Sequence, residues 1–182
     1  HAQNELSQSS RQQYLELFSL LLAAFLSRLL IAWFVPGFPV DISCFRAWAN
    51  QMAEIGPAGF YLTDTLSDYP PGYMLVLWPL GLIGRALGTG ATEMMVKLPA
   101  IFFDMGIVTL LYLIAKKSVG HRAALLLAML YAFSPLPYLV GSAWGQVDSV
   151  PSLLLMIAVL MISTQRWQFA LPVYVLAVLM KP

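Results

Sequence analysis

The chain has 182 residues, of which 59% are hydrophobic and only 10% are charged, and its mean hydropathy is positive. Such a chain cannot cover itself with enough polar surface to be a soluble globule, so we expect an integral membrane protein. The net charge of +1, without a basic stripe, argues against a nucleic-acid partner. One cysteine, Cys44, excludes an intramolecular disulfide.

Both ends of the sequence are abrupt. The first residue is His1, and the last letters, "VLMKP", directly follow an apolar run. These ends predict a fragment of a longer protein, truncated at the C-terminus. We expect residues 1–14 to be a polar N-terminal tail on a single transmembrane module that spans residues 1–182.

Five apolar windows qualify as membrane segments. A bilayer core about 30 Å thick needs roughly 20 helical residues, and five windows come close to that length. In chain order they are residues 17–34, 98–115, 123–140, 150–163 and 167–180. The predicted fold class is therefore an all-α membrane protein with about five transmembrane helices.

Residues 73–84 form a shorter uncharged run before Arg85, interrupted by Pro79 and Gly81, and runs of this length more often lie in the interface, re-enter or pack on other helices. The question is whether residues 73–88 cross the membrane. If they do not cross, the basic connections "KKSVGHR" and "TQRW" fall on the same side as Arg11, which the positive-inside rule makes cytoplasmic. If they cross, the densest basic cluster falls outside. We adopt the first alternative, which makes residues 36–97 one external loop.

Two interfacial helices are predicted inside this loop. Apolar side chains recur every three or four residues over 41–55, at Ile42, Phe45, Trp48, Met52 and Ile55. This pattern predicts an amphipathic helix along the membrane surface, capped at its start by Asp41. A second helix over 71–87 is expected to begin at the proline pair of "YPPGY".

Seven of the nine acidic residues fall on the external side in this topology, namely Asp41, Glu54, Asp64, Asp68, Glu93, Asp104 and Asp148. Four have structural alternatives: Asp41 and Asp148 as helix N-caps, Asp68 as a polar lead-in to the proline turn, and Asp104 as an ion-pair partner of Lys97. Their common side instead favours a vestibule where carboxylates activate an acceptor hydroxyl or bind a divalent cation.

Other residues suit a phosphorylated sugar ligand. Arg28 and Arg46 carry permanent charge for a phosphate, and Lys181 is a further candidate, although Arg28 alternatively pairs with a lipid headgroup or a neighbouring helix. Five aromatic side chains suit either an aromatic belt at the membrane interface or stacking on a sugar ring, namely Tyr69, Tyr73, Trp48, Trp78 and Trp144.

The order of these elements resembles a known family. Together with "VDISCFRAW", "SDYPPGYMLVLW", "KLPAIFFDMGIVTLLYLIAKK", "AFSPLPYLVGSAWGQVDSV" and the terminal "KP", it resembles the N-terminal module of GT-C glycosyltransferases of the dolichyl-phosphate-mannose mannosyltransferase kind. The resemblance covers roughly residues 15–182. In that family further membrane helices and a C-terminal domain are expected to follow the part that this sequence covers.

The resemblance implies roles for particular residues. The catalytic positions are Asp41 and Asp68, and Asp104 and Lys181 match positions that bind the substrate. Further substrate-binding candidates of this chain are Arg46, Tyr69, Tyr73 and Gln146. Asp41 and Asp148 are the candidate ligands of a divalent cation, Mg²⁺ or Mn²⁺. Many relatives have an adjacent Asp-Glu pair, whereas here Ile42 follows Asp41, which puts metal dependence in question.

The implied function is sugar transfer from a polyprenyl-phosphate donor to an unidentified acceptor hydroxyl, at the extracytoplasmic face of a multi-pass protein of the cell membrane with a cytoplasmic N-terminus. The alternative is a non-catalytic module, either a carrier or flippase of lipid-linked sugars or a subunit that needs a protein partner. A transporter would show broken helices in two matching halves, and only "FSPLP" is such a break. The long external loop favours the transferase.

Overall fold

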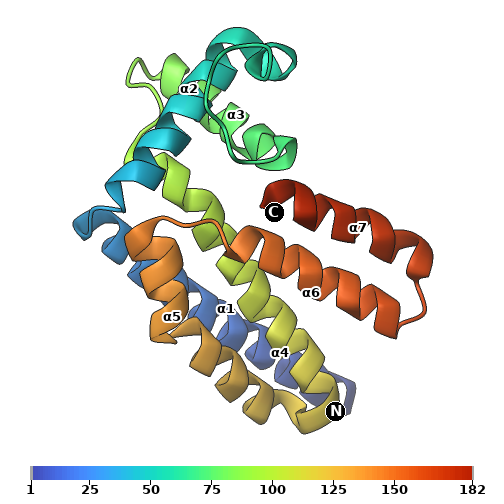
Figure 1. Ribbon diagram of the computed structural model, residues 1–182. Coiled ribbons are helices and arrows are strands. Elements are labelled where there is room, and N and C mark those ends of the chain that lie inside the picture. Colours follow the sequence, from blue (N-terminus) through green and yellow to red (C-terminus); the bar gives the residue numbers. More distant parts are fainter. Residues whose placement is uncertain (1, 182) are drawn as a thin grey trace.

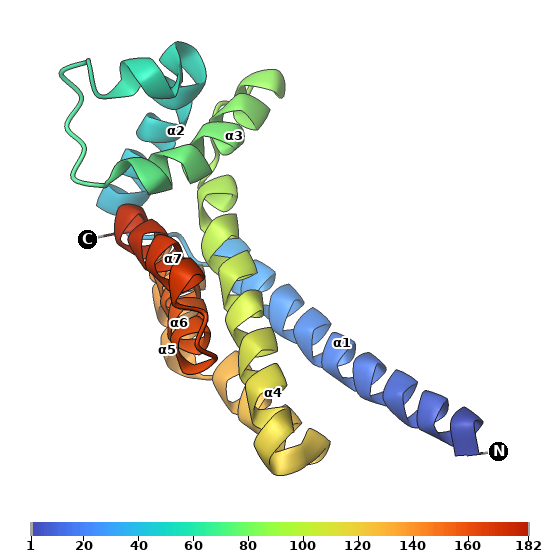
Figure 2. The same ribbon diagram turned by 90° about the vertical axis from the view of Figure 1, so that its right-hand side faces the viewer.

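The computed structural model describes residues 2–181, which contain helices and connecting segments and no strand. The elements are α1 (Ala2–Phe34), α2 (Pro39–Phe60), α3 (Pro71–Ala86), α4 (Glu93–Ala132), α5 (Pro135–Pro137), the π-helix η1 (Tyr138–Trp144), α6 (Ser149–Ser163) and α7 (Trp167–Met180). α1 packs on α4, α4 on α6, and α6 on α7. Figures 1 and 2 show α2 and α3 gathered at one end of these helices. The predicted all-α class is confirmed.

Helix α4 consists of two arms joined at Gly120, the first covering residues 93–119 and the second residues 121–132. Gly120 has φ 79° and ψ 175°, a conformation outside the helical region that glycine adopts without steric cost. Figure 1 shows the chain reversing in the yellow part of α4. The reversal falls between the predicted segments 98–115 and 123–140.

Two segments are long and apolar enough to cross a membrane, Ser10–Phe34 and Glu93–Trp144, as judged by length and composition. Helices α6 and α7 are also apolar but have only 15 and 14 residues. A straight crossing needs roughly 20. The structure thus supports membrane-length apolar helices, and the count of about five crossings remains a prediction.

Small residues let α1 and the two arms of α4 come close together. Ala124, Ala128 and Ala132 lie four residues apart on the second arm and are fully buried, as is Ala24 of α1. Small side chains on one helix face allow backbones to approach closely, which is how helices associate where lipid removes the hydrophobic driving force.

The apolar face of α2 is covered by protein. Four of the five predicted positions are buried, namely Ile42, Phe45, Trp48 and Met52. Ile55 is 41% exposed and directly precedes the break in the helix at Gly56, whose φ is 74°. The face packs against Tyr73, Met74 and Leu77 of α3. The expected periodicity is confirmed and the partner of this face is α3, while the position of α2 along the membrane surface remains a prediction.

The predicted caps differ from the observed ones. Helix α2 begins at Pro39, with Phe38 at the N-cap, so Asp41 lies in the first turn and does not cap the helix. Asp148 does occupy the N-cap position of α6, but its side chain makes no capping hydrogen bond. Helix α3 begins at Pro71, as expected. Neither the Asp41 nor the Asp148 carboxylate therefore caps the start of a helix through a hydrogen bond.

The contact between α2 and α3 depends on Gly81. A Cβ atom at this position would clash with the carbonyl oxygen of Ala49 in α2. We expect Gly81→Ala to lower the free energy of unfolding by about 1–3 kcal/mol, the usual cost of overpacking. Thermal unfolding in detergent measures this cost. Gly59→Ala is the matched control, because a Cβ there meets only ordinary contacts at 3.5 Å or more; equal effects of the two changes would contradict the prediction.

Candidate functional site

Polar side chains from four parts of the chain meet beside the start of α2. The Oδ2 atom of Asp41 accepts hydrogen bonds from Nε1 of Trp144 at 2.7 Å and Nε2 of Gln146 at 2.5 Å. The Oε1 atom of Gln146 accepts one from Nζ of Lys181 at 3.0 Å. The same Nζ lies 2.5 Å from Oδ1 of Asp148. We call these five residues the acidic network.

A glycine conformation shapes the segment that carries Trp144 and Gln146. Gly145 follows η1 with φ 92°, in the left-handed region that favours glycine. A Cβ there would also lie 2.6 Å from Cδ1 of Ile42. The backbone N–H groups of Gly145 and Gln146 both donate to the carbonyl of Val140. The chain therefore turns sharply after η1 and lies against the first turn of α2.

Tyr69 joins the acidic network from the loop before α3. Its hydroxyl donates to Oε1 of Gln146 at 3.4 Å. Burial raises the pKa of this phenol above its usual value, and the charges of Asp148, Asp41 and Asp68 raise it further. The phenol consequently stays protonated at neutral pH and acts as a hydrogen-bond donor.

The other predicted site residues of this end of the molecule lie in α2, in the loop before α3 and in α3 itself. Asp68 is exposed and lies next to Tyr69. Tyr73 is fully buried, with its ring 5.5 Å from that of Phe45, and burial raises its pKa. The structure thus places Tyr73 in the core beneath Tyr69, out of reach of a substrate. Arg46 donates through Nε to the carbonyl of Ala91 at 2.9 Å, which ties it to the segment before α4.

Asp104 forms a buried ion pair with Arg28. Nε of Arg28 lies 3.1 Å from Oδ2 of Asp104, and Tyr131 donates to Oδ1 of Asp104 at 3.1 Å. Arg28 is fully buried, and its Nη1 also donates to the carbonyl of Ala132 at 2.8 Å. Of the alternatives for Arg28, the structure favours pairing with a neighbouring helix. This arginine is not placed to bind a phosphate.

Lys97 is not the partner of Asp104. Its Nζ lies 2.8 Å from Oε1 of Glu93 and donates to the carbonyls of Val35 at 2.8 Å and Ala32 at 3.3 Å. These carbonyls belong to the C-terminal end of α1 and its first following residue, where backbone acceptors lack helical partners. The alternative in which Lys97 pairs with Asp104 is therefore wrong, because the buried ammonium is satisfied by the Glu93 carboxylate one turn earlier in α4 and by two carbonyls at the end of α1.

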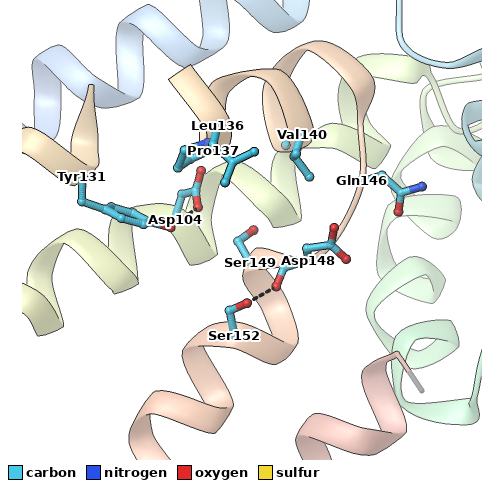
Figure 3. Close-up of a pocket in the computed structure, with 10 residues that line it drawn as sticks. Asp104, Tyr131, Leu136, Pro137, Val140, Gln146, Asp148, Ser149 and Ser152 are labelled. Carbon is cyan, nitrogen blue, oxygen red and sulfur yellow. Dashed lines mark hydrogen bonds between the residues drawn. The ribbon is translucent and has the colours of Figure 1, made fainter. Parts of the chain in front are cut away.

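A cavity of about 380 Å³ connects the buried ion pair with the acidic network. Asp104 and Tyr131 line one end, and Gln146 and Asp148 line the other, as Figure 3 shows. Apolar side chains of Leu136, Pro137 and Val140 form the wall between them. The cavity has polar groups at both ends and can take a compact polar molecule.

A second hollow follows α6 and α7 away from the acidic network. Asp148 and Lys181 line its head, in a cleft of about 500 Å³. Leu155 and Tyr174 line both this cleft and an adjoining one of about 430 Å³, which ends near Trp167 and has an almost wholly apolar lining. An apolar groove thus ends at a lysine and an aspartate.

The donor set does not form a closed metal site. Among residues 10–181, whose side chains the structure describes, no group of three or more His, Cys, Asp and Glu side chains could hold a metal ion. The Gln146 amide and the Lys181 ammonium connect the carboxylates of Asp41 and Asp148. An ammonium in contact with Asp148 opposes a second cation there. We derive no step through a metal, and the predicted Mg²⁺ or Mn²⁺ remains a prediction.

The structure shows an all-helical chain with two apolar segments of membrane length and an acidic site at the head of an apolar groove. Residues 68–181, well over half of the chain, match the family described as dolichyl-phosphate-mannose-protein mannosyltransferase. The chain belongs to this family of membrane-bound GT-C glycosyltransferases, as its motifs predicted. No curated protein and no solved structure matched the chain.

Sequence reasoning missed two contacts at the site. Trp144 was assigned only to an aromatic belt or to sugar stacking, whereas its indole N–H donates to Asp41. Tyr131 was not singled out, although it contacts Asp104 and lines the cavity. Gly145, between Trp144 and Gln146, was a signal for a turn in the sequence. Nothing in the sequence indicates which acidic residue accepts hydrogen bonds from the side chains beside it.

Removal of one partner of the buried ion pair should destabilise the protein strongly. We expect Asp104→Leu to lower the free energy of unfolding by about 3–5 kcal/mol, since it leaves the buried Arg28 charge uncompensated. Tyr131→Phe is the matched control and should cost less, about 1.5–3 kcal/mol, the value of one hydrogen bond to a charged group. Unfolding in detergent measures both. The double variant Arg28→Leu/Asp104→Leu should regain stability, and failure to do so would contradict an ion-pair origin.

Proposed function

We propose that this chain is a glycosyltransferase module that transfers a sugar from a polyprenyl-phosphate donor to an acceptor hydroxyl. The family match supports a glycosyltransferase with a dolichyl-phosphate-sugar type of donor. The sugar, the acceptor and the extracytoplasmic side of the reaction belong to the proposal.

The observation that carries the proposal is the position of Lys181 and Asp148 at the head of the apolar groove. A polyprenyl phosphate has an apolar tail and an anionic end, which is the combination that the groove and Lys181 would accept. A lysine contacts a phosphate as a point charge. Gln146 connects Lys181 to Asp41, so the phosphate end of the donor would lie close to a second carboxylate.

In the proposed reaction, Asp41 acts as the general base. The proton of the acceptor hydroxyl passes to the Asp41 carboxylate while the hydroxyl oxygen forms a bond with the anomeric carbon of the sugar. The bond from that carbon to the phosphate oxygen breaks, and its electron pair stays on the lipid phosphate. Lys181 would stabilise the charge that collects on this leaving group. Asp68, exposed beside Tyr69, is a second acidic group on the approach to the site.

The proposed orientation follows from the two ends of the molecule. The N-terminus, the turn at Gly120 and the turn between α6 and α7 lie towards one end in Figures 1 and 2, and α2 and α3 lie at the other. The connections at the first end carry Lys116, Lys117, Arg122 and Arg166. The positive-inside rule favours placing that end in the cytoplasm. The acidic network would then face the extracytoplasmic side.

Loss of the base should abolish most of the turnover. We expect Asp41→Asn to reduce sugar release from labelled polyprenyl-phosphate sugars by about 10²–10⁴-fold, the usual contribution of a general base. The assay uses the purified chain in detergent, with and without EDTA, and the EDTA lane tests the predicted cation. Asp64→Asn is the matched control, because Asp64 is an exposed acid in the loop between α2 and α3. Comparable release by a folded Asp41→Asn variant would refute the assignment.

Loss of the lysine should weaken binding of the lipid phosphate. We expect Lys181→Gln to raise the dissociation constant for undecaprenyl phosphate about 10- to 100-fold, because a hydrogen bond to a charged group contributes about 1.5–3 kcal/mol. Lys117→Gln, at the opposite end of the molecule, should leave it unchanged. Binding that depends on Lys181 without turnover of any donor would instead favour the non-catalytic carrier or partner-dependent module.

A further inference from the structure

Two N–H groups hold the same oxygen of Asp41. Nε1 of Trp144 and Nε2 of Gln146 both donate to Oδ2, at 2.7 Å and 2.5 Å. We propose that Trp144 is a positioning residue for the transfer reaction: with Gln146 it fixes Oδ2 of Asp41, so that Oδ1 is the oxygen that takes the proton of the acceptor. This inference rests on the proposed function.

Trp144 is held in place from both its backbone and its ring. The backbone N–H of Phe38 donates to the carbonyl of Trp144 at 2.8 Å, and the two rings lie 5.0 Å apart. A Cβ at Gly37 would come within 2.7 Å of the same carbonyl, so a larger residue would push Trp144 away. Phe38, in the segment just before α2, thus contacts both the backbone and the ring of Trp144 and lies three residues before Asp41.

The π-helical turn gives Trp144 its position. Segments of π-helix are rare and occur frequently at functional sites, because the wider turn displaces the following side chains relative to an α-helix. η1 begins at Tyr138, whose ring lies over Arg28 at 4.3 Å, and it ends at Trp144. One end of η1 is therefore anchored at the buried ion pair, and the other end contacts the carboxylate.

Gln146 supplies the second donor in a defined orientation. Its Oε1 accepts from Lys181 at 3.0 Å and from Tyr69 at 3.4 Å, so its amide N–H₂ group faces Asp41. Both polar ends of this amide are engaged by protein groups. Gln146 therefore acts in the network as a bridge between Asp41 and Lys181, a different role from the substrate contact expected from the sequence.

The two hydrogen bonds fix the orientation of the Asp41 carboxylate. A carboxylate has two acceptor oxygens and can rotate about its Cβ–Cγ bond, and a base works only within hydrogen-bond reach of the proton that it takes. Two donors on Oδ2 stop this rotation and aim Oδ1 in a single direction. A misplacement of about 1 Å at a reacting group can cost about 10²-fold in rate.

The test compares variants that differ in the indole N–H. Labelled sugar release from polyprenyl-phosphate sugars is measured for the full chain with Trp144→Phe and with 3-benzothienylalanine at position 144, which keeps the ring shape but has sulfur in place of N–H. We expect both changes to lower kcat about 10- to 100-fold, as for loss of a hydrogen bond to a charged group, while KM for the donor changes less than about twofold. Trp33→Phe, at an exposed tryptophan of α1, should leave both constants unchanged.

The outcomes separate this inference from the proposed function. If the parent chain turns over and the benzothienyl variant keeps its kcat, the N–H does not position Asp41 and the inference fails alone. A loss of kcat that is matched by loss of donor binding and thermal stability would also overturn it, since Trp144 would then be a scaffold residue. If the parent chain releases sugar from no donor, the proposed function fails and the inference fails with it.

Discussion

The buried guanidinium of Arg28 is the constraint on which the rest of the structure depends. A charge inside an apolar helical bundle must be neutralised and hydrogen-bonded, and the partners of this one come from different segments. Asp104 lies on the first arm of α4, the carbonyl of Ala132 ends the second arm, and the ring of Tyr138 opens η1. Nη2 of Arg28 has no hydrogen-bond partner among the described residues, and the face of the Tyr138 ring attracts the guanidinium in its place. One side chain therefore sets the relative positions of α1, both arms and η1.

The positions of the site residues follow from this arrangement. The first residue of η1, Tyr138, contacts Arg28, and its last residue, Trp144, contacts Asp41. The same short helix therefore joins the interior of the bundle to the acidic network. Some charged residues stabilise the fold, and others are available at the site. Arg28 and Lys97 are fully buried and satisfy carbonyls at helix ends, whereas the side chains of Lys181 and Asp148 keep 29% and 49% exposure beside a groove. Exposure at an apolar groove is what a site for a lipid-linked phosphate requires.

Much of the helical architecture could be predicted, because the signals are local. The three- and four-residue spacing of α2, the proline start of α3 and the reversal near Gly120 all appear in the structure. The partners of individual charges could not be predicted in this way. Lys97 and Asp104 share a helix face and suggested an ion pair, but Asp104 pairs with Arg28 of α1, and Lys97 pairs with Glu93 and with carbonyls at the end of α1. Asp41 was expected to cap a helix, and the start of α2 at Pro39 leaves its carboxylate to accept from Trp144 and Gln146.

The sequence by itself determined that this protein is helical, strongly apolar and related to the mannosyltransferases, because composition, periodicity and short motifs are properties of neighbouring residues. Only the tertiary structure decided which of its few charges meet. The contacts of Arg28 with Asp104 and of Asp41 with Gln146 join residues 76 and 105 positions apart. Such contacts form when packing removes water from two distant groups and leaves each as the other's nearest partner, and no local pattern records that outcome.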